Sequence, residues 1–212
     1  MGSDNPITFI KQSIRDFKNT GALAPSGAFL ARAIAKCLPE QTDNDYRILE
    51  VGPGTGAVTG EIVKKMDGDG HLDLWEISPA FCTHLRKRIA QEKAFVRMNS
   101  RIDVHEGDVR DLEAKPRYDA IIAGLPFTNF EPPEVQGFLE HFQALLKPNG
   151  ALIWFEYVAI RKIQSPFVSK ARREKLKRVG DVTARFIRAH QFKQQIIPIN
   201  IPPARIRLLR FG

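Results

Sequence analysis

Cysteine is scarce in this sequence, and the two that occur, Cys37 and Cys82, lie 45 positions apart. Neither has a histidine or a second cysteine at the spacing typical of metal ligands. We therefore expect no metal centre and no disulfide framework. A chain of this kind suits a reducing compartment such as the cytosol.

Long apolar runs are also missing. No stretch of 18 apolar residues occurs, and the most hydrophobic segment, residues 151–160, is interrupted by Glu156. The chain does not open with a charged segment followed by an apolar one, as a secretory signal does. The sequence therefore predicts neither a membrane-spanning helix nor export.

Acidic residues are rare in the last quarter of the chain. Residues 157–212 contain 14 Lys and Arg but only 2 Asp and Glu, whereas residues 1–156 contain 18 and 22. Positive charge of this density suits a polyanion, either nucleic acid or an anionic membrane surface. The alternative is a solvated helix whose charges serve solubility alone.

A glycine-rich turn is the most informative stretch that is present. Three glycines, at positions 52, 54 and 56, follow an apolar strand over residues 48–51 and precede a helical segment. They let the backbone adopt positive φ and approach a bound molecule with no Cβ in between. Strand, turn and helix form the first half of a βαβ unit with a ligand-binding turn. The same glycines also fit a dinucleotide fingerprint, so the turn alone leaves the cofactor open.

Segments with strand and helix patterns alternate along the chain. The patterns predict strands over residues 46–51, 71–76, 102–109, 118–123, 151–158, 192–199 and 205–211, and helices over residues 28–38, 57–66, 79–93, 132–146 and 181–189. Residues 147–150 indicate a turn, and residues 170–178 a separate basic segment. This alternation predicts one α/β domain with a parallel sheet covered by helices on both faces.

Apolar residues recur at helical spacing near the N-terminus. Ile7, Ile10, Ile14 and Phe17 alternate with the basic residues Lys11, Arg15 and Lys18. This is the pattern of a basic amphipathic helix, which either caps the core of the domain or lies in a membrane interface. We therefore divide the chain into N-terminal amphipathic helices, residues 1–44, serving as a membrane or lid segment, and a main domain, residues 45–212.

Four features stand at the carboxyl ends of successive predicted strands: the glycine turn, Glu76, Asp108, and residues 124–127 with the sequence Gly-Leu-Pro-Phe. Open α/β sheets bind ligands at this edge. Glu76 lies 20 residues beyond Gly56, where a carboxylate can accept both hydroxyls of a ribose. Alternatively, it is an acid at a helix N-terminus. Together the four features resemble the class I S-adenosylmethionine-dependent methyltransferases, over residues 45–157.

This resemblance implies a Rossmann-like sheet of seven strands, mostly parallel with the last strand antiparallel, and S-adenosylmethionine as the cofactor. It implies that residues 50–56 hold the methionine end, Glu76 the ribose, and Asp108 with Val109 the adenine edge. The cofactor-binding residues are then Glu50, Gly52, Pro53, Gly54, Thr55, Gly56, Glu76, Ile77, Asp108, Val109 and Gly124. A nicotinamide enzyme is disfavoured, because the chain offers no second nucleotide-binding half.

The acceptor is indicated by a finer resemblance. Residues 20–26 and the Gly-Leu-Pro-aromatic motif resemble the bacterial phospholipid N-methyltransferases, which convert phosphatidylethanolamine stepwise toward phosphatidylcholine. The same region resembles the ribosomal RNA adenine dimethyltransferases, whose motif begins with asparagine where this chain has Gly124. The missing amide oxygen favours the lipid enzyme. So do the 54 residues that follow Val158, which are too few for the helical domain that the RNA enzymes usually carry. A methyltransferase fold that binds without turnover is a third alternative.

The lipid resemblance assigns roles to further residues. Phe127 would lie beside the methyl group, while the Leu125 carbonyl and the Tyr157 hydroxyl would orient the amine; Tyr157 is alternatively a core residue. Arg161 and Lys162 would contact the lipid phosphate, and Lys11, Arg15 and Lys18 the anionic membrane surface. The protein would then be cytoplasmic and peripherally bound to the inner face of the membrane. Nucleic acid would be a partner only under the RNA alternative.

Overall fold

A seven-stranded sheet forms the centre of the part of the chain described by the computed structural model, which covers residues 25–41, 45–66, 70–158, 169–200 and 203–211. The strands are β1 (Arg47–Val51), β2 (His71–Glu76), β3 (Ile102–Glu106), β4 (Tyr118–Ala123), β5 (Leu146–Tyr157), β6 (Gln191–Ile197) and β7 (Ala204–Arg210). Their order in the sheet is β3-β2-β1-β4-β5-β7-β6. Five neighbouring strands are parallel, and β7 runs antiparallel between β5 and β6. The predicted Rossmann-like fold class is confirmed.

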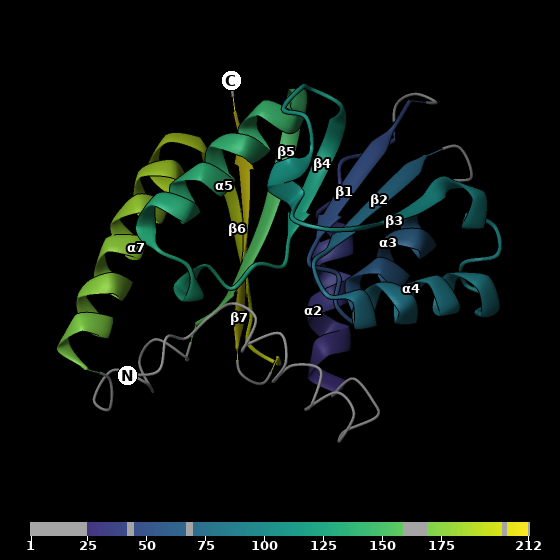
Figure 1. Cartoon of the computed structure of the whole chain (residues 1–212), viewed down its shortest axis with the longest axis horizontal. Helices are drawn as coiled ribbons and strands as arrows, with labels where there is room; N and C mark the ends of the chain where they lie inside the picture. The colour runs from purple at the N-terminus through teal and green to yellow at the C-terminus, as the bar shows by residue number, and fades with distance from the viewer. Residues whose placement is uncertain (1–24, 42–44, 67–69, 159–168, 201–202, 212) are drawn as a thin grey trace.

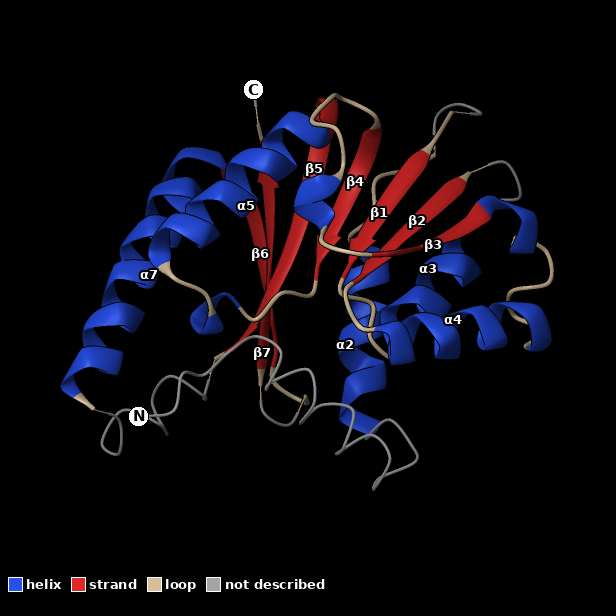
Figure 2. Cartoon of the chain, viewed as in Figure 1, coloured by secondary structure: helices blue, strands red, loops and turns tan. Residues whose placement is uncertain are grey.

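Helices cover both faces of this sheet (Figures 1 and 2). They are α2 (Pro25–Lys36), α3 (Ala57–Lys65), α4 (Pro79–Gln91), α5 (Pro132–Leu145) and α7 (Lys170–His190), with the short 3-10 turns η1 (Asn99–Arg101), η2 (Val109–Asp111) and η3 (Phe127–Asn129). The helices α2, α3 and α4 share one hydrophobic cluster with the sheet, and α5 and α7 share the other. The N-terminal segment therefore contributes α2 to the packed core.

Alternation along the strands explains why there are two clusters. Ile48 and Ile122 point into the cluster with α2, α3 and α4, whereas their neighbours Leu49 and Ile121 point into the cluster with α5 and α7. All four side chains are at most 1% exposed. A strand with apolar residues on both faces has to lie in the middle of a covered sheet. This rigid centre fixes the positions of the strand ends.

Several helix and strand boundaries differ from the sequence prediction, including three in α2, β5 and α7. The helix α2 begins at Pro25 rather than at residue 28. The strand β5 begins at Leu146 and includes the predicted turn over residues 147–150, where Asn149 adopts a φ of 66° and the register of pairing with β4 shifts. The basic segment 170–178 and the helix predicted after it are one helix, α7, that continues through Gly180. Its apolar side packs on α5, which stabilises it despite the glycine.

The order of the strands creates a switch point between β1 and β4. After β1 the chain continues to β2 and β3 in one half of the sheet. After β4 it continues to β5 in the other half. In such sheets the loops after the two central strands diverge and leave a crevice at the carboxyl ends. Those loops are the glycine turn after β1 and residues 124–127 after β4.

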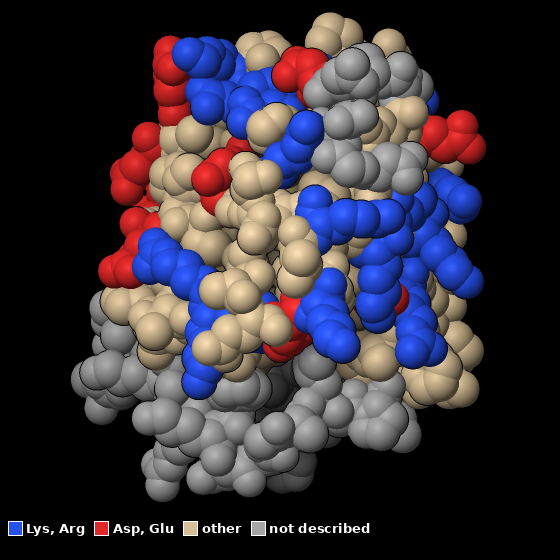
Figure 3. All heavy atoms as spheres, turned by 90° about the vertical axis from the view of Figure 1, so that its right-hand side faces the viewer, with Lys and Arg blue, Asp and Glu red and all other residues tan. Residues whose placement is uncertain are grey.

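Basic side chains gather on the surface near the β3 edge of the sheet, seen in Figure 3. The helix α4 contributes exposed Arg86 and Lys87 to this side of the molecule. Positive surface charge is therefore not confined to the C-terminal quarter, where the sequence shows its excess. Within the described residues, no helix combines the length and apolarity needed to cross a bilayer.

Candidate active site

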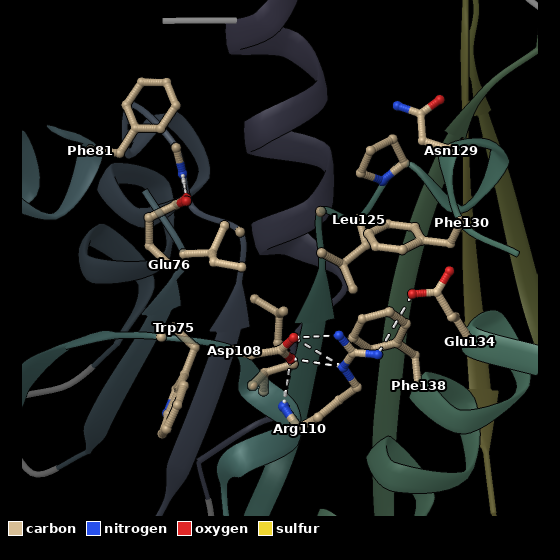
Figure 4. Close-up of a pocket in the computed structure, with 18 of the residues that line it drawn as sticks. Trp75, Glu76, Phe81, Asp108, Arg110, Leu125, Asn129, Phe130, Glu134 and Phe138 are labelled. Carbon is tan, nitrogen blue, oxygen red and sulfur yellow. Dashed lines mark hydrogen bonds and ion pairs between the residues drawn. The ribbon is translucent and has the colours of Figure 1, made fainter. Parts of the chain in front are cut away.

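A cavity of about 460 Å³ lies across the carboxyl ends of β1, β2, β3 and β4 (Figure 4). It is lined by Val51, Gly52, Gly54, Thr55, Trp75, Glu76, Ile77, Phe81, Gly107, Asp108, Val109, Arg110, Gly124, Leu125, Pro126, Asn129, Phe130, Glu134 and Phe138. Eight of the residues expected to bind a cofactor are therefore brought together here: Gly52, Gly54, Thr55, Glu76, Ile77, Asp108, Val109 and Gly124. The size is typical of a small-molecule site.

The floor of the cavity is bare backbone where β1 and β4 end. The N–H of Gly124 donates to the carbonyl of Val51 at 2.9 Å, which holds the two loops together. A Cβ placed on Gly124 would lie 3.0 Å from the Gly52 carbonyl oxygen and 3.2 Å from that of Val51. Gly52 itself has a φ of 69°. Glycine at both positions therefore allows the two loops to approach this closely.

Glu76 closes one side of the cavity and is only 5% exposed. Its carboxylate accepts hydrogen bonds from the N–H of Gly54 at 3.0 Å and from the N–H of Ser78 at 2.9 Å. Burial raises the pKa of Glu76, and these backbone donors oppose the rise. The carboxylate thus ties the glycine turn to the end of β2 and is fixed in position toward the cavity, as Figure 4 shows.

Glu50 lies beneath the glycine turn rather than in the cavity wall. It is 3% exposed, and one oxygen accepts a hydrogen bond from the Thr59 hydroxyl at 2.7 Å. Burial raises the pKa of Glu50 to about 7; the hydrogen bond from Thr59 lowers it and the charge of Glu76 adds to the rise. Glu50 therefore connects the end of β1 to α3 and changes charge near neutral pH.

Gly56 has a packing role that the sequence alone did not reveal. A Cβ there would come within 2.8 Å of both the Leu85 Cδ2 and an Arg88 guanidinium nitrogen. Arg88 donates to the carbonyls of Thr55 and Gly56 at 2.6 and 2.9 Å. Gly56 and the buried Pro53 lie outside the cavity wall, so they shape the turn from behind.

Asp108 and Arg110 form an ion pair on the opposite wall. The Asp108 carboxylate accepts from the Arg110 N–H and from its guanidinium, with Nε 3.0 Å from both oxygens. This pairing lowers the pKa of Asp108. The guanidinium also lies 3.8 Å from the Glu134 carboxylate and 4.7 Å from the centre of the Phe138 ring. Arg110 thus bridges the end of β3 to α5, between Asp108 and Glu134 in Figure 4.

The corner after β4 places its two phenyl rings differently from expectation. Phe127 is 4% exposed and packs in the core, with its ring centre 5.1 Å from Trp154 and 6.4 Å from Phe138. The ring that lines the cavity is Phe130, three residues later at the end of η3. Phe127 begins the 3-10 turn η3 and packs inward, whereas Phe130 follows the turn with an extended backbone and reaches the cavity. The Leu125 carbonyl accepts the Phe127 N–H at 3.0 Å.

Tyr157 lies apart from this cavity. It ends β5, is 40% exposed, and lines a smaller cavity between β5, β7 and α7. Burial of its hydroxyl end raises the pKa of Tyr157. Arg161, Lys162, Lys11, Arg15 and Lys18 fall outside the described residues, as does the predicted N-terminal amphipathic helix.

Several cavity residues were not identified from the sequence. Arg110 stands two positions after Asp108, and Glu134 and Phe138 are one turn apart on α5. Their shared helix face was predictable, because residues four apart lie on one side of a helix. That this face meets the cavity depends on how α5 packs. Phe130 carried no signal, because the motif drew attention to Phe127.

The cavity suits an elongated ligand with a ribose and an apolar base. The side-chain-free floor at Gly52 and Gly124 admits a group close to the backbone, and Glu76 supplies acceptors for hydroxyls. Ile77 and Val109 add apolar side chains to the cavity wall. No cluster of three or more potential metal ligands occurs among the residues that the structure describes.

Known sequences support this interpretation. Residues 48–150 match the family model described as a methyltransferase domain. The ornithine lipid N-methyltransferase of Singulisphaera acidiphila is 33% identical over 136 residues, which are 61% of this chain and 66% of that enzyme. A probable dimethyladenosine transferase of Caenorhabditis elegans is 33% identical over 94 residues, but these cover 44% of this chain and 28% of that protein. The chain thus spans just under two thirds of the first relative.

Solved structures share the fold at low sequence identity. The glycopeptide N-methyltransferase MtfA complexed with sinefungin has a TM-score of 0.65 and 16% identity, covering 92% of this chain and 91% of that one. The O-methyltransferase from Bacillus cereus in complex with SAH has a TM-score of 0.62 and 14% identity, covering 98% and 94%. Residues 48–150 thus match a methyltransferase domain, the described residues share the fold of solved methyltransferases, and the SAH and sinefungin bound in those structures are consistent with S-adenosylmethionine as the cofactor.

Proposed function

We propose that this protein transfers methyl groups from S-adenosylmethionine to the amine of phosphatidylethanolamine and of its methylated intermediates at a membrane surface. The match to an enzyme named for ornithine lipid supports an amine lipid as the acceptor class. Both lipids present an alkylamine near an acidic group. The phosphatidylethanolamine assignment rests on the resemblance of residues 20–26 and 124–127 to phospholipid N-methyltransferases.

The structural observation that carries this proposal is the lack of room for a side chain at position 124. The RNA enzymes use an asparagine there, and a Cβ at this position would crowd the Gly52 carbonyl at 3.0 Å. The surrounding corner is formed by Leu125, Pro126 and Phe130. Apart from the amide of Asn129, which also lines the cavity, this corner is apolar, and it suits a small alkylamine better than an adenine that needs hydrogen-bond partners.

The chemistry of an amine acceptor fits this corner. S-adenosylmethionine supplies a methyl group bonded to a positively charged sulfur. An alkylamine is mostly protonated at neutral pH and must lose a proton before its lone pair can react. The apolar corner favours the neutral amine by desolvation, and the second lone pair of the Leu125 carbonyl can accept one of its N–H groups. The product ammonium can contact the Phe130 ring, a contact worth about 0.5–2 kcal/mol.

Association with the membrane is a further part of the proposal. The N-terminal segment, residues 1–44, would contribute Lys11, Arg15 and Lys18 to anionic lipid binding, with Arg161 and Lys162 near the lipid phosphate. The enzyme would act on the cytoplasmic side as a peripheral protein. Surface charge near the β3 edge, seen in Figure 3, adds to the attraction for anionic lipid.

Methylation of adenine N6 in ribosomal RNA is the second candidate. The match to a probable dimethyladenosine transferase supports it, although the match covers 28% of that protein. In this case the positive charge would bind phosphates of RNA, and the target base would be flipped against a phenyl ring. Gly124 in place of asparagine counts against it.

One labelling experiment distinguishes these functions. The protein is incubated with methyl-labelled S-adenosylmethionine and, in separate reactions, with vesicles of phosphatidylethanolamine, vesicles of ornithine lipid, or ribosomal RNA. We expect label in phosphatidylethanolamine. Label only in ornithine lipid would identify that lipid, rather than phosphatidylethanolamine, as the substrate. Label only in RNA would overturn the lipid proposal. Label in none of them, with cofactor binding intact, would indicate a fold that binds without turnover.

A further inference from the structure

A second cavity at the same edge of the sheet has no role in the site described so far. Its volume is about 180 Å³, and it lies between the end of β5, the start of β7 and the middle of α7. Three charged side chains line it: Glu156 of β5, and Arg205 and Arg207 of β7. Because β7 is antiparallel to β5, its first residues lie beside the last residues of β5, and Glu156 pairs directly with Arg205.

Arg207 is fully engaged within the fold. Its Nε and one terminal nitrogen donate to the Glu156 Oε1 at 3.1 and 2.9 Å. The other terminal nitrogen donates to Gln191 at 2.7 Å and to Gln194 at 3.4 Å. The side chain is 12% exposed. Arg207 therefore neutralises Glu156 and holds this carboxylate in place.

The positive charge of Arg205 is only partly paired within the fold. Its terminal nitrogen lies 3.5 Å from the same Glu156 oxygen that Arg207 already occupies. Its Nε is buried and has no hydrogen-bond partner. The Arg205 side chain is 28% exposed, so it is neither fully hydrated nor fully paired. A guanidinium in this state has donors available in a fixed plane, which is the geometry that carboxylates and phosphates accept.

We propose that Arg205, with Arg207 behind it, forms a binding subsite for the acidic group of the acceptor. This inference rests on the proposed function and deepens it: the substrate is an amine that carries a phosphate diester or a carboxylate at a fixed distance. The strand β5 separates β7 from β4, and neighbouring strands are about 4.8 Å apart. The subsite therefore lies about 10 Å from the corner after β4.

The first test compares two arginines of the same strand. Arg205→Met removes the proposed contact, whereas Arg210→Met removes an equal charge from an exposed side chain that stacks on Phe192 at 4.6 Å. With amine-lipid vesicles we expect Arg205→Met to raise KM about tenfold or more with little change in kcat, and Arg210→Met to leave both unchanged. Arg205→Lys, which keeps the charge, should recover part of the loss. An equal rise in KM for both methionine variants would overturn the subsite.

The second test measures binding without turnover. Glycerophosphoethanolamine, ornithine and ethanolamine are titrated by calorimetry into the protein saturated with S-adenosylhomocysteine. We expect the two acid-bearing amines to bind the wild type and to bind Arg205→Met at least about tenfold more weakly, while ethanolamine is unaffected. The compound whose affinity falls more in Arg205→Met identifies the natural acidic group: phosphate if it is glycerophosphoethanolamine, carboxylate if it is ornithine.

The outcomes of this second test separate two kinds of failure. Equal weakening for ethanolamine, or a parallel loss of S-adenosylhomocysteine affinity in Arg205→Met, would assign Arg205 to the structure and overturn the subsite. If no lipid is methylated, the proposed function fails, yet glycerophosphoethanolamine binding that depends on Arg205 would still establish the subsite.

Discussion

Glu50 is a carboxyl group buried where a charge is costly. Its pKa is raised to about 7 by burial, with Thr59 and Arg88 lowering it and Glu76 raising it. An unfolded glutamate titrates near 4.5, so between these two pH values the folded state holds a proton that the unfolded state has lost. The free energy of unfolding therefore falls as pH rises from about 4.5 to about 7, and this contribution is constant outside that window.

Glu50→Gln should remove this pH dependence. Glutamine keeps an oxygen that can accept the Thr59 hydroxyl but carries no charge. Relative to the wild type, we expect the variant to gain up to about 3 kcal/mol in free energy of unfolding between pH 5 and pH 8. Urea unfolding at both pH values measures the difference. A mutational effect of equal size at both pH values would contradict the raised pKa.

Glu76 should matter for the cofactor more than for the fold. Replacing it with glutamine removes the charge that we propose accepts the ligand hydroxyls, and it removes one acceptor of the backbone N–H groups of Gly54 and Ser78. We expect Glu76→Gln to weaken S-adenosylmethionine binding by about 1.5–3 kcal/mol, or roughly 10- to 100-fold. Calorimetric titration measures this loss.

Glu106→Gln is the matched control for this change. Glu106 pairs with Glu76 in the neighbouring strand, but its side chain is 45% exposed and does not line the cavity. Its substitution should leave the affinity unchanged. Similar S-adenosylmethionine affinities for the wild type and Glu76→Gln would show that Glu76 does not contribute to cofactor binding.

Of the charged residues that line the cavity, the sequence identified Glu76 and Asp108 but not Arg110 and Glu134. Glu76 and Asp108 follow directly from strand ends, which are set by apolar patterns that the structure reproduces. Phe127 and Phe130 are both phenylalanines in one short loop, and only the 3-10 turn decides which of them faces the cavity. The lipid resemblance assigns Tyr157 to the amine, but the pairing of β5 with β7 places this side chain at the smaller cavity instead.

At the scale of helices, the contact between α3 and α4 depends on one glycine. Gly56 has a φ of 76°, and a Cβ would meet Leu85 and Arg88 of α4 at 2.8 Å. We expect Gly56→Ala to lower the free energy of unfolding by about 2 kcal/mol or more, through backbone strain and overpacking. Thermal and denaturant unfolding measure this change.

A second glycine provides the matched control. Gly137 is inside α5, and a Cβ there meets nothing within 4 Å. Gly137→Ala should stabilise the protein by about 0.5–1 kcal/mol, because alanine loses less backbone entropy in a helix. Equal effects of the two substitutions would show that space around Gly56 does not limit the packing.

Helix and strand bounds were predictable where local pattern and tertiary packing agree. Both ends of β2 and β4 match the sequence prediction, since turns or charged residues flank their apolar runs. The full length of α7 was missed because Gly180 and a run of basic residues suggest a break. Packing of Val179, Val182 and Phe186 on α5 overrides that local preference. Residues 147–150 carry turn signals, yet pairing with β4 at Leu146 and again from Ala151 keeps them within the strand.

For the whole molecule, the cavity joins four strand ends, so a ligand there links segments far apart in the sequence. A ligand that binds only the folded state stabilises it by about 2.7 kcal/mol at 100 times its Kd. For a chain of 212 residues this corresponds to a rise in Tm of roughly 5–11 °C with S-adenosylhomocysteine. Differential scanning calorimetry measures the shift. NAD at the same concentration should produce none, and an equal shift with NAD would revive the dinucleotide reading of the glycine turn.

Glu50 and Glu76 are both buried and interact electrostatically. Ligand binding is therefore coupled to proton exchange with the buffer. With a pKa near 7, roughly half of the Glu50 carboxyl groups carry a hydrogen at neutral pH. A cation entering the cavity favours the ionised form, so Glu50 passes part of a proton to the buffer. The heat of S-adenosylmethionine association at pH 7 should therefore vary with the ionisation enthalpy of the buffer, and Glu50→Gln should abolish this variation.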